Sequence, residues 1–338
     1  MTSAGPFRAR VRRGAIAAAI AAIAAVSGIA GSADAGSAGG APARAALAPP
    51  TAAEVREATR EFLSRHRDAD PDEVRPRAGA GPPRPGREIF PSQRVVSFYG
   101  APQLTATVVG RNSPAEAGRK LLDQAAAYEG PNRRPVIPAI DLIGVIATAS
   151  AGSDGKYRTR QSSQIIDTYL ARARRIGARL MLDIQPGRAN VLRELKALRR
   201  YVVQPDLDLA IDPEWNVGPR GVPGRTRGSI TARKLNRFSK RMQRLIKRRG
   251  LPPKVLVVHQ FHSRSVRKRN RVRQRPRVAV TLNFDGIGSP AAKRAGYVDL
   301  RARRTHDGFS IFYSRDRPLM RPRDVLALEP EPDFVLYQ

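Results

Sequence analysis

The sequence predicts an α/β protein whose main domain is a (β/α)8 TIM barrel. Eight short apolar runs lie between residues 93 and 338, and longer amphipathic segments separate them. Strands that alternate with helices in this way are typical of parallel βα units. Eight such units in about 245 residues match the size of this barrel class. An open, doubly wound α/β sheet is the alternative fold.

The eight apolar runs have the length and composition of buried strands. They span residues 94–99, 136–143, 179–185, 207–212, 254–260, 277–285, 309–313 and 334–338. Helices are expected between them, at residues 113–128, 162–176, 189–202, 230–249, 290–300 and 323–328, with a weaker one at 266–272. Ser113-Pro114 opens the first as N-cap and N1 proline, and Gly177 and Gly250 stand at C-cap positions.

The strand at residues 207–212 carries the acids on which the functional prediction depends. Side chains alternate along a strand, so its two leucines and its isoleucine share one face and its aspartates the other. In a barrel the apolar face meets the helices and the other face lines the interior. We therefore expect Asp208, Ala210, Asp212 and Glu214 on the interior face, with a proline ending the ladder between the last two.

The other strands also place small or polar residues on one face, with functional groups near the carboxyl end. In a barrel these ends converge on one mouth, where such folds keep their active sites. The candidate mouth residues are Tyr99, Asp141, Asp183, Gln185, Asp212, Glu214, Trp215, His259, Gln260, Asp285, Tyr313 and Tyr337. Acids, amides and aromatic rings together are what a sugar-binding site requires.

The acids of the mouth predict glycosidase-like catalysis. Two carboxyl groups flank the scissile bond in such enzymes, and one of them must hold a proton. We assign Glu214 as general acid and Asp212 as the group that orients it or stabilises positive charge, with Asp183 or Asp285 as base or nucleophile. The remaining candidates are expected to contact the substrate, with Trp215 stacking on a sugar ring or packing beside the site.

Two alternatives remain open at this point. A non-catalytic glycan- or cell-wall-binding protein would keep the mouth and lack a competent acid/base pair. A metal-dependent hydrolase would use Asp183, Asp212, Glu214, His259 and Asp285 as ligands of a divalent ion. Because the sequence has neither HxH nor HExxH spacing, we expect no metal and no cofactor.

Residues 1–35 have the order of a secretory signal peptide: basic residues, an apolar run, then Ala33-Asp34-Ala35 as a cleavage site. An uncleaved membrane anchor is the alternative, although the apolar run is short for a span. Residues 36–92 are expected to be a largely disordered linker, rich in proline, glycine and arginine, with one short helix at 51–67. The barrel domain then covers 93–338, and the protein is expected to be secreted or cell-wall associated.

The formal net charge is +32, or +29 once the signal's four arginines and one aspartate are removed. Residues 264–277 hold eight Lys or Arg and no acid, which fits a solvated loop or a docking patch for an acidic polymer. The expected partner is a polysaccharide or anionic cell-wall polymer. We expect a monomer, membrane contact only through the signal peptide, and no sequence-specific nucleic-acid binding. The absence of cysteine excludes disulfides and thiol catalysis.

Several motifs mark the segment from residue 93 to the C-terminus: VSFYG at 96–100, LDIQPG at 182–187, DPEW at 212–215, LVVHQF at 256–261 and FDGIG at 284–288. Together they resemble a largely uncharacterised family of exported proteins from high-GC Gram-positive bacteria, which implies a glycoside-hydrolase-like barrel. The DPEW motif is also similar to the strand-four motif of family 18 chitinases and, more loosely, to the Asp-x-Glu of family 25 lysozymes. Leu207 and Ala210 stand where the chitinase motif has acids.

The signal peptide makes a prediction about the mature chain. If cleavage follows Ala35, protein recovered from culture medium or cell wall begins near Gly36. Mass spectrometry of the N-terminal peptide measures this. An intact Met1 in the membrane fraction would show that the segment is an anchor instead.

Overall fold

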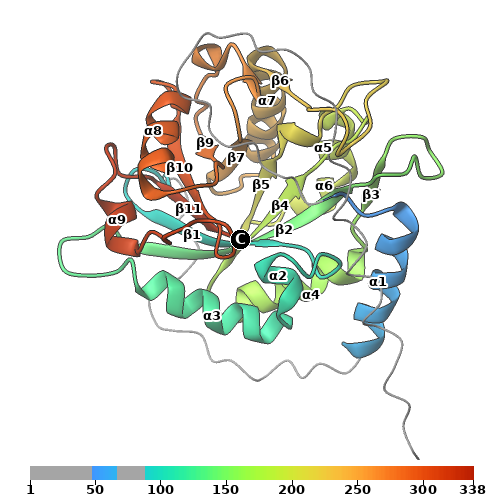
Figure 1. The fold of residues 1–338 in the computed structure, drawn as a ribbon, viewed down its shortest axis with the longest axis horizontal. Helices are drawn as coiled ribbons and strands as arrows, with labels where there is room; N and C mark the ends of the chain where they lie inside the picture. The colour runs from blue at the N-terminus through green and yellow to red at the C-terminus, as the bar shows by residue number, and fades with distance from the viewer. Residues whose placement is uncertain (1–47, 67–87) are drawn as a thin grey trace, which may run out of the picture. The chain divides into compact units, whose positions relative to one another are not determined.

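The computed structural model describes residues 48–66 and 88–338, so the predicted signal peptide and most of the predicted linker lie outside the described residues. Eight parallel strands form a closed barrel (Figure 1). They are β1 (Arg94–Gly100), β2 (Val136–Ala147), β4 (Arg179–Ile184), β5 (Leu207–Ile211), β7 (Lys254–Gln260), β9 (Val278–Phe284), β10 (His306–Ile311) and β11 (Phe334–Tyr337). Strand β1 pairs with both β11 and β2. This closure confirms the predicted barrel and excludes the open sheet.

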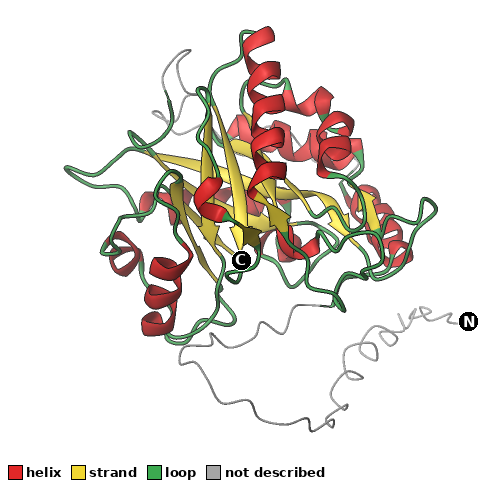
Figure 2. Ribbon diagram, turned by 90° about the horizontal axis from the view of Figure 1, so that it is seen from above, coloured by secondary structure: helices red, strands yellow, loops and turns green. Residues whose placement is uncertain are grey.

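Helices surround the strands (Figure 1, Figure 2). They are α1 (Ala52–Arg65), α2 (Val108–Arg111), α3 (Pro114–Ala126), α4 (Ser163–Arg175), α5 (Val191–Ala197), α6 (Arg199–Val202), α7 (Ala232–Arg248), α8 (Pro290–Leu300) and α9 (Pro322–Leu326). Ser113, Thr231 and Ser289 begin α3, α7 and α8 as N-caps, because each side chain accepts a backbone hydrogen bond from the first turn. The single helix expected at 189–202 is divided into α5 and α6.

Several short strands and 3₁₀ helices lie in the loops at the carboxyl ends of the barrel strands. β3 (Arg158–Arg160) extends β2 in antiparallel pairing, and η1 (Pro213–Trp215) is a 3₁₀ helix directly after β5. The loops after β5 and β7 are joined by a two-stranded parallel sheet of β6 (Ile230–Thr231) and β8 (Val266–Arg267). The α-helix expected at 266–272 is not formed: this stretch holds β8 and a second 3₁₀ helix, η2 (Arg269–Arg271).

The two faces of the strands bury different sets of side chains. Leu207, Leu209 and Ile211 belong to the large cluster between strands and helices. Ala210 and Met181 belong to a second cluster that fills the barrel interior. The predicted alternation along β5 is therefore confirmed.

A charged pair lies inside the barrel where the strands begin. Asp208 accepts two hydrogen bonds from the guanidinium of Arg179, at 2.5 and 2.9 Å, and a third from the backbone N–H of Val255. Both charged side chains are almost completely buried. Three strands are tied together here, because these residues belong to β4, β5 and β7.

Helix α1, which the sequence analysis places in the linker, packs against the barrel beside α4 (Figure 1). Its Phe62 ring stacks on Tyr169 at 6.2 Å between centroids, and its Thr59 hydroxyl accepts from the Gln103 side chain at 2.8 Å. The apolar contact and the hydrogen bond anchor the segment that precedes the barrel. No helix within residues 48–66 and 88–338 is both long and apolar enough to cross a membrane.

Replacing Asp208 by Asn should lower the free energy of unfolding by about 3–5 kcal/mol, because Arg179 would remain buried without a counter-charge. Urea denaturation measures the effect. Asp206→Asn is the matched control, since its ion pair with Arg174 is half exposed on the cation side and should contribute less than about 1 kcal/mol. If both variants lose similar free energies of unfolding, burial of the Arg179–Asp208 pair is not the reason for its contribution to stability.

Candidate active site

Parallel register gathers the predicted polar groups at one end of the barrel. Tyr99 on β1 pairs with Asp141 on β2, and Ile143 on β2 pairs with Asp183 on β4. His259 on β7 pairs with Asn283 on β9. These positions lie near the carboxyl ends of their strands, where a barrel places its functional groups.

Asp141 is completely buried, and neither of its carboxylate oxygens accepts a hydrogen bond from a described residue. Its Oδ2 lies 3.8 Å from Nε2 of His259. Burial raises the pKa of the Asp141 carboxyl well above its ordinary value, and the nearby charges of Asp285 and Asp212 raise it further. Asp141 is thus predisposed to hold a proton.

Asp183 is equally buried but is linked to neighbouring polar groups. Its Oδ2 accepts a hydrogen bond of 3.2 Å from the Tyr99 hydroxyl, which in turn accepts one of 2.9 Å from the Gln185 amide. Burial raises the pKa of Asp183 well above its usual range, and the charge of Asp141 adds to this effect, while the bond from Tyr99 opposes it. Because the charges of Asp141 and Asp183 act on each other, the two carboxyl groups gain and lose protons as a coupled pair.

His259 lies between two carboxylates. Its Nε2 faces Asp141, and its Nδ1 is 3.9 Å from Oδ2 of Asp285 and 3.2 Å from the Asn283 amide nitrogen. The other oxygen of Asp285 accepts a 2.9 Å hydrogen bond from the side chain of Gln338, the last residue of the chain. The C-terminus accordingly lies among the strand ends (Figure 1, Figure 2).

Asp212 and Glu214 are arranged differently from the prediction. Strand β5 ends at Ile211, and Pro213 begins η1, so Glu214 does not continue the interior face of the strand. The side chain of Asp212 caps η1 by accepting the backbone N–H of Glu214 at 3.1 Å. Glu214 is half-buried, and its carbonyl accepts the N–H of Gly228 at 2.8 Å. Pro213 causes this departure, because it cannot extend the ladder and favours a turn.

A cavity of about 220 Å³ lies above the buried carboxyl groups. Its walls include Tyr99, Gln185 and Gln338 from the strand ends, Trp215 from η1 and Gln103 from the loop after β1. None of the candidate acids lines it directly. Asp183 is nevertheless one hydrogen bond from the cavity through Tyr99, and Asp285 is one hydrogen bond from it through Gln338.

Residues 48–50, just before α1, form part of the cavity wall. The carbonyl of Pro50 accepts the N–H of Ala149 at 2.8 Å, in the loop after β2. On the opposite side Pro49 lies against Gly224, where a Cβ would be 2.6 Å from the proline ring. Glycine is also favoured at 224 by its φ of +83°. The segment before α1 is therefore fitted between two mouth loops.

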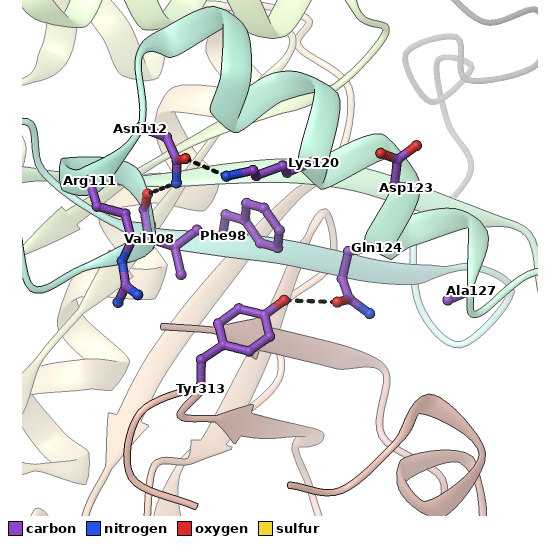
Figure 3. A pocket seen from close by; sticks show the side chains of 9 residues that line it. All are labelled: Phe98, Val108, Arg111, Asn112, Lys120, Asp123, Gln124, Ala127 and Tyr313. Carbon is purple, nitrogen blue, oxygen red and sulfur yellow. Dashed lines mark hydrogen bonds between the residues drawn. The ribbon is translucent and has the colours of Figure 1, made fainter.

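Three predicted mouth residues lie on the outer face of the barrel instead. The amide of Gln260 donates to the carbonyl of Leu300 at the end of α8. The hydroxyl of Tyr337 is 2.6 Å from that of Tyr128, beyond the end of α3. Tyr313 donates to Gln124 of α3 at 2.8 Å and lines a separate pocket of about 440 Å³ (Figure 3). Their expected position at the mouth is corrected, because each belongs to the opposite parity of its strand or to the loop beyond it.

The structure adds mouth residues that the sequence analysis did not select. Gln338 lies at the mouth, where its neighbour Tyr337 was predicted to lie. The alternation of side chains along the last strand allows either residue to face the interior. Gln103 and Gln161 exchange amide hydrogen bonds of 2.7 and 3.0 Å and join the loop after β1 to the segment between β3 and α4. No sequence pattern indicated that pair, because the two residues are 58 positions apart.

The metal-dependent alternative requires several ligand side chains close together. In the part of the chain that the structure describes, no group of three or more His, Asp or Glu side chains is arranged to hold a metal ion. Asp183, Asp212, Glu214, His259 and Asp285 therefore do not form a ready ligand set.

Comparison with known proteins adds no assignment to this site. No protein-family model matches the chain, and no curated protein matches its sequence. A functional proposal for the mouth consequently depends on its geometry and chemistry.

The raised pKa of Asp141 predicts that Asp141→Asn is more stable than the wild type at neutral pH. The folded state binds the proton more tightly than the unfolded state, so wild-type stability falls as pH rises above about 4, the pKa of an unfolded aspartate. Asparagine stays neutral, and its advantage should grow to about 1–2 kcal/mol. Urea denaturation from about pH 4 to about pH 8, with the exposed Asp299→Asn as control, measures this. A pH-independent difference would contradict the buried, proton-holding state.

Proposed function

We propose that the protein is a glycosidase-like hydrolase that acts on polysaccharide of the cell envelope or extracellular space. The observation that carries the proposal is the buried pair Asp141 and Asp183, whose raised pKa supplies an acid beneath a cavity walled by Tyr99 and Trp215. A protonated carboxyl group at neutral pH is what a general acid requires. Aromatic rings and amides at the same cavity suit a sugar with its hydroxyl groups.

Asp183 takes the role of proton source in this proposal, in place of Glu214. Asp183 is bonded to the Tyr99 hydroxyl, which lines the cavity, whereas Glu214 lies on η1 outside the cavity wall. In its protonated state Asp183 donates this hydrogen bond to the Tyr99 oxygen, and Tyr99 donates its own proton to the glycosidic oxygen. As the bond to the anomeric carbon breaks, Tyr99 gives its proton to the leaving group and regains one from Asp183, which is left ionised. Asp285 and Asp212 are the remaining carboxylates at the mouth, and one of them activates the water that replaces the leaving group.

The size of the cavity restricts the substrate. At about 220 Å³ it is smaller than the roughly 300–1,000 Å³ of pockets that enclose a drug-sized ligand. Residues 48–50 on one side and Trp215 on another leave room for one terminal unit of a chain. We therefore propose action at polymer ends, by a protein that is secreted or associated with the cell wall.

A non-catalytic glycan-binding protein is the second candidate. It is favoured by the position of the acids, which lie beneath the cavity wall, and by Asp212, which caps η1. Such a protein would bind the terminal sugar through Tyr99, Gln185, Trp215 and Gln338 and leave the bond intact.

The catalytic proposal predicts that Asp183→Asn lowers turnover by roughly 10²- to 10⁴-fold, as expected for a lost general acid. Tyr99→Phe should lower turnover as well, because it removes the hydroxyl that links Asp183 to the cavity by a hydrogen bond. Turnover is measured as reducing ends released from peptidoglycan and chitin fragments and from a wider polysaccharide panel.

Two comparisons make the test decisive. Glu57→Gln, an exposed carboxylate on α1, should leave turnover unchanged. Loss of turnover in Glu214→Gln together with full activity in Asp183→Asn would show that Glu214, and not Asp183, is the general acid. Wild-type protein that binds a glycan and cleaves none of the panel would support the binding protein instead.

A further inference from the structure

A second cavity, of about 730 Å³, lies on the outside of the barrel between α7 and the segment that follows β7. Helix α7 contributes Arg233, Arg237 and Lys240 to its wall. The facing segment, residues 267–275, contributes four arginines and Lys268. No acidic and no aromatic residue lines this cavity, which we call the cationic groove.

The charges of the cationic groove are not neutralised by the rest of the described protein. None of its eight cations forms an ion pair with a carboxylate of residues 48–66 or 88–338. Elsewhere in the same residues, arginines such as Arg158 and Arg174 do form such pairs. Eight like charges around one cavity repel one another, so an anionic ligand would relieve their mutual repulsion.

The groove is held open by specific backbone contacts. Asn236 of α7 donates to the carbonyl of Arg271 at 2.8 Å and accepts the N–H of Arg273 at 2.9 Å. The start of the facing segment is fixed by the pairing of β8 with β6, which directly precedes α7. The cationic side chains are therefore mounted on a rigid frame, which lowers the entropy that binding must overcome.

Neighbouring groups respond to the positive field. Burial lowers the pKa of Lys234, and the charges of Arg237 and Arg267 lower it further. Burial likewise lowers the pKa of His262, with Arg227 and Arg264 adding to the effect. A field that disfavours protonation at two separate sites also favours a bound anion.

We infer that the cationic groove binds a phosphate-bearing polymer without bases, such as a phosphodiester-linked glycan or polyol or a polyphosphate chain. Six of the eight cations are arginines, whose planar guanidinium groups match phosphate in bidentate geometry. Single-stranded nucleic acids need aromatic side chains on which bases stack, and the groove has none. Its length along α7 suits an extended chain in contact with several phosphates at once.

The groove is continuous with the rim of the barrel mouth. Arg267 also lines a smaller cavity of about 420 Å³, together with Arg227, Arg264 and His262. Gly228, in the wall of that cavity, donates its N–H to the carbonyl of Glu214. A chain bound in the groove could therefore extend toward the mouth. This extension rests on the proposed function, whereas binding in the groove itself does not depend on it.

The test uses the full-length protein and inorganic polyphosphate as the probe. The variant Arg237→Gln/Arg271→Gln/Arg273→Gln should bind at least roughly tenfold more weakly. The plot of log affinity against log salt concentration, whose slope is negative, should become less steep by about one for each cation removed. The matched control, Arg193→Gln/Arg303→Gln/Arg304→Gln, removes three exposed arginines elsewhere and should bind like the wild type. Asp183→Asn should also bind like the wild type, which separates this inference from the catalytic one.

Several results would overturn the inference. Equal weakening in both triple variants would mean that net charge alone attracts the polymer. Equal affinity of the groove for polygalacturonate would refute the phosphate assignment, and tighter binding of oligothymidylate would point to nucleic acid. If the groove triple variant fails to fold by circular dichroism, each single substitution carries the test, with a change of about one in slope.

Discussion

Closure of the barrel between β1 and β2 determines where the polar side chains of the strand interior can lie. An open sheet would leave its edge strands exposed, whereas the closed sheet converts one face of all eight strands into a single interior. Residues on that face have no access to bulk water unless they stand at a barrel end. The carboxyl ends therefore concentrate acids, amides and a histidine that the sequence distributes between Asp141 and Gln338.

The interior handles its buried charges in two ways. At the amino end, Asp208 is neutralised by Arg179, and the pair fastens neighbouring strands. At the carboxyl end, Asp141 accepts no hydrogen bond from a described residue, and Oδ2 of Asp183 accepts one from the Tyr99 hydroxyl. Burial without a counter-charge is costly for an ionised carboxylate, so the favoured state is the protonated one. The first arrangement suits stability, and the second suits proton transfer.

The loops after β5 and β7 join the barrel mouth to the outer surface. Their small β6–β8 sheet sets the distance between α7 and the arginine-rich segment, and the loop from η1 to β6 connects that sheet with Glu214. Under the proposed function, one extended and anionic chain would contact both the cationic groove outside the barrel and the cavity above the buried carboxyl groups. Eight of the chain's 61 lysines and arginines are gathered around the cationic groove.

The eight barrel strands, most of the helices and the interior position of Asp208 on β5 follow from the sequence, because alternation with period two and the spacing of apolar runs are local properties. Parity alone did not distinguish Tyr337 from Gln338, since both faces of a parallel strand are buried and both residues fit. Strand parity also could not predict three other features. Glu214 lies on η1 and not on the strand, residues 48–50 line the cavity, and Arg179 forms an ion pair with Asp208. Those features depend on contacts between distant segments, which form only when the barrel closes. The sequence by itself determined the eight strands and the alternation along each of them, because both are local properties. The tertiary structure decided which of the candidate residues reach the mouth, which of the buried charges are paired and which side chains line the cavity, because these depend on contacts between distant segments.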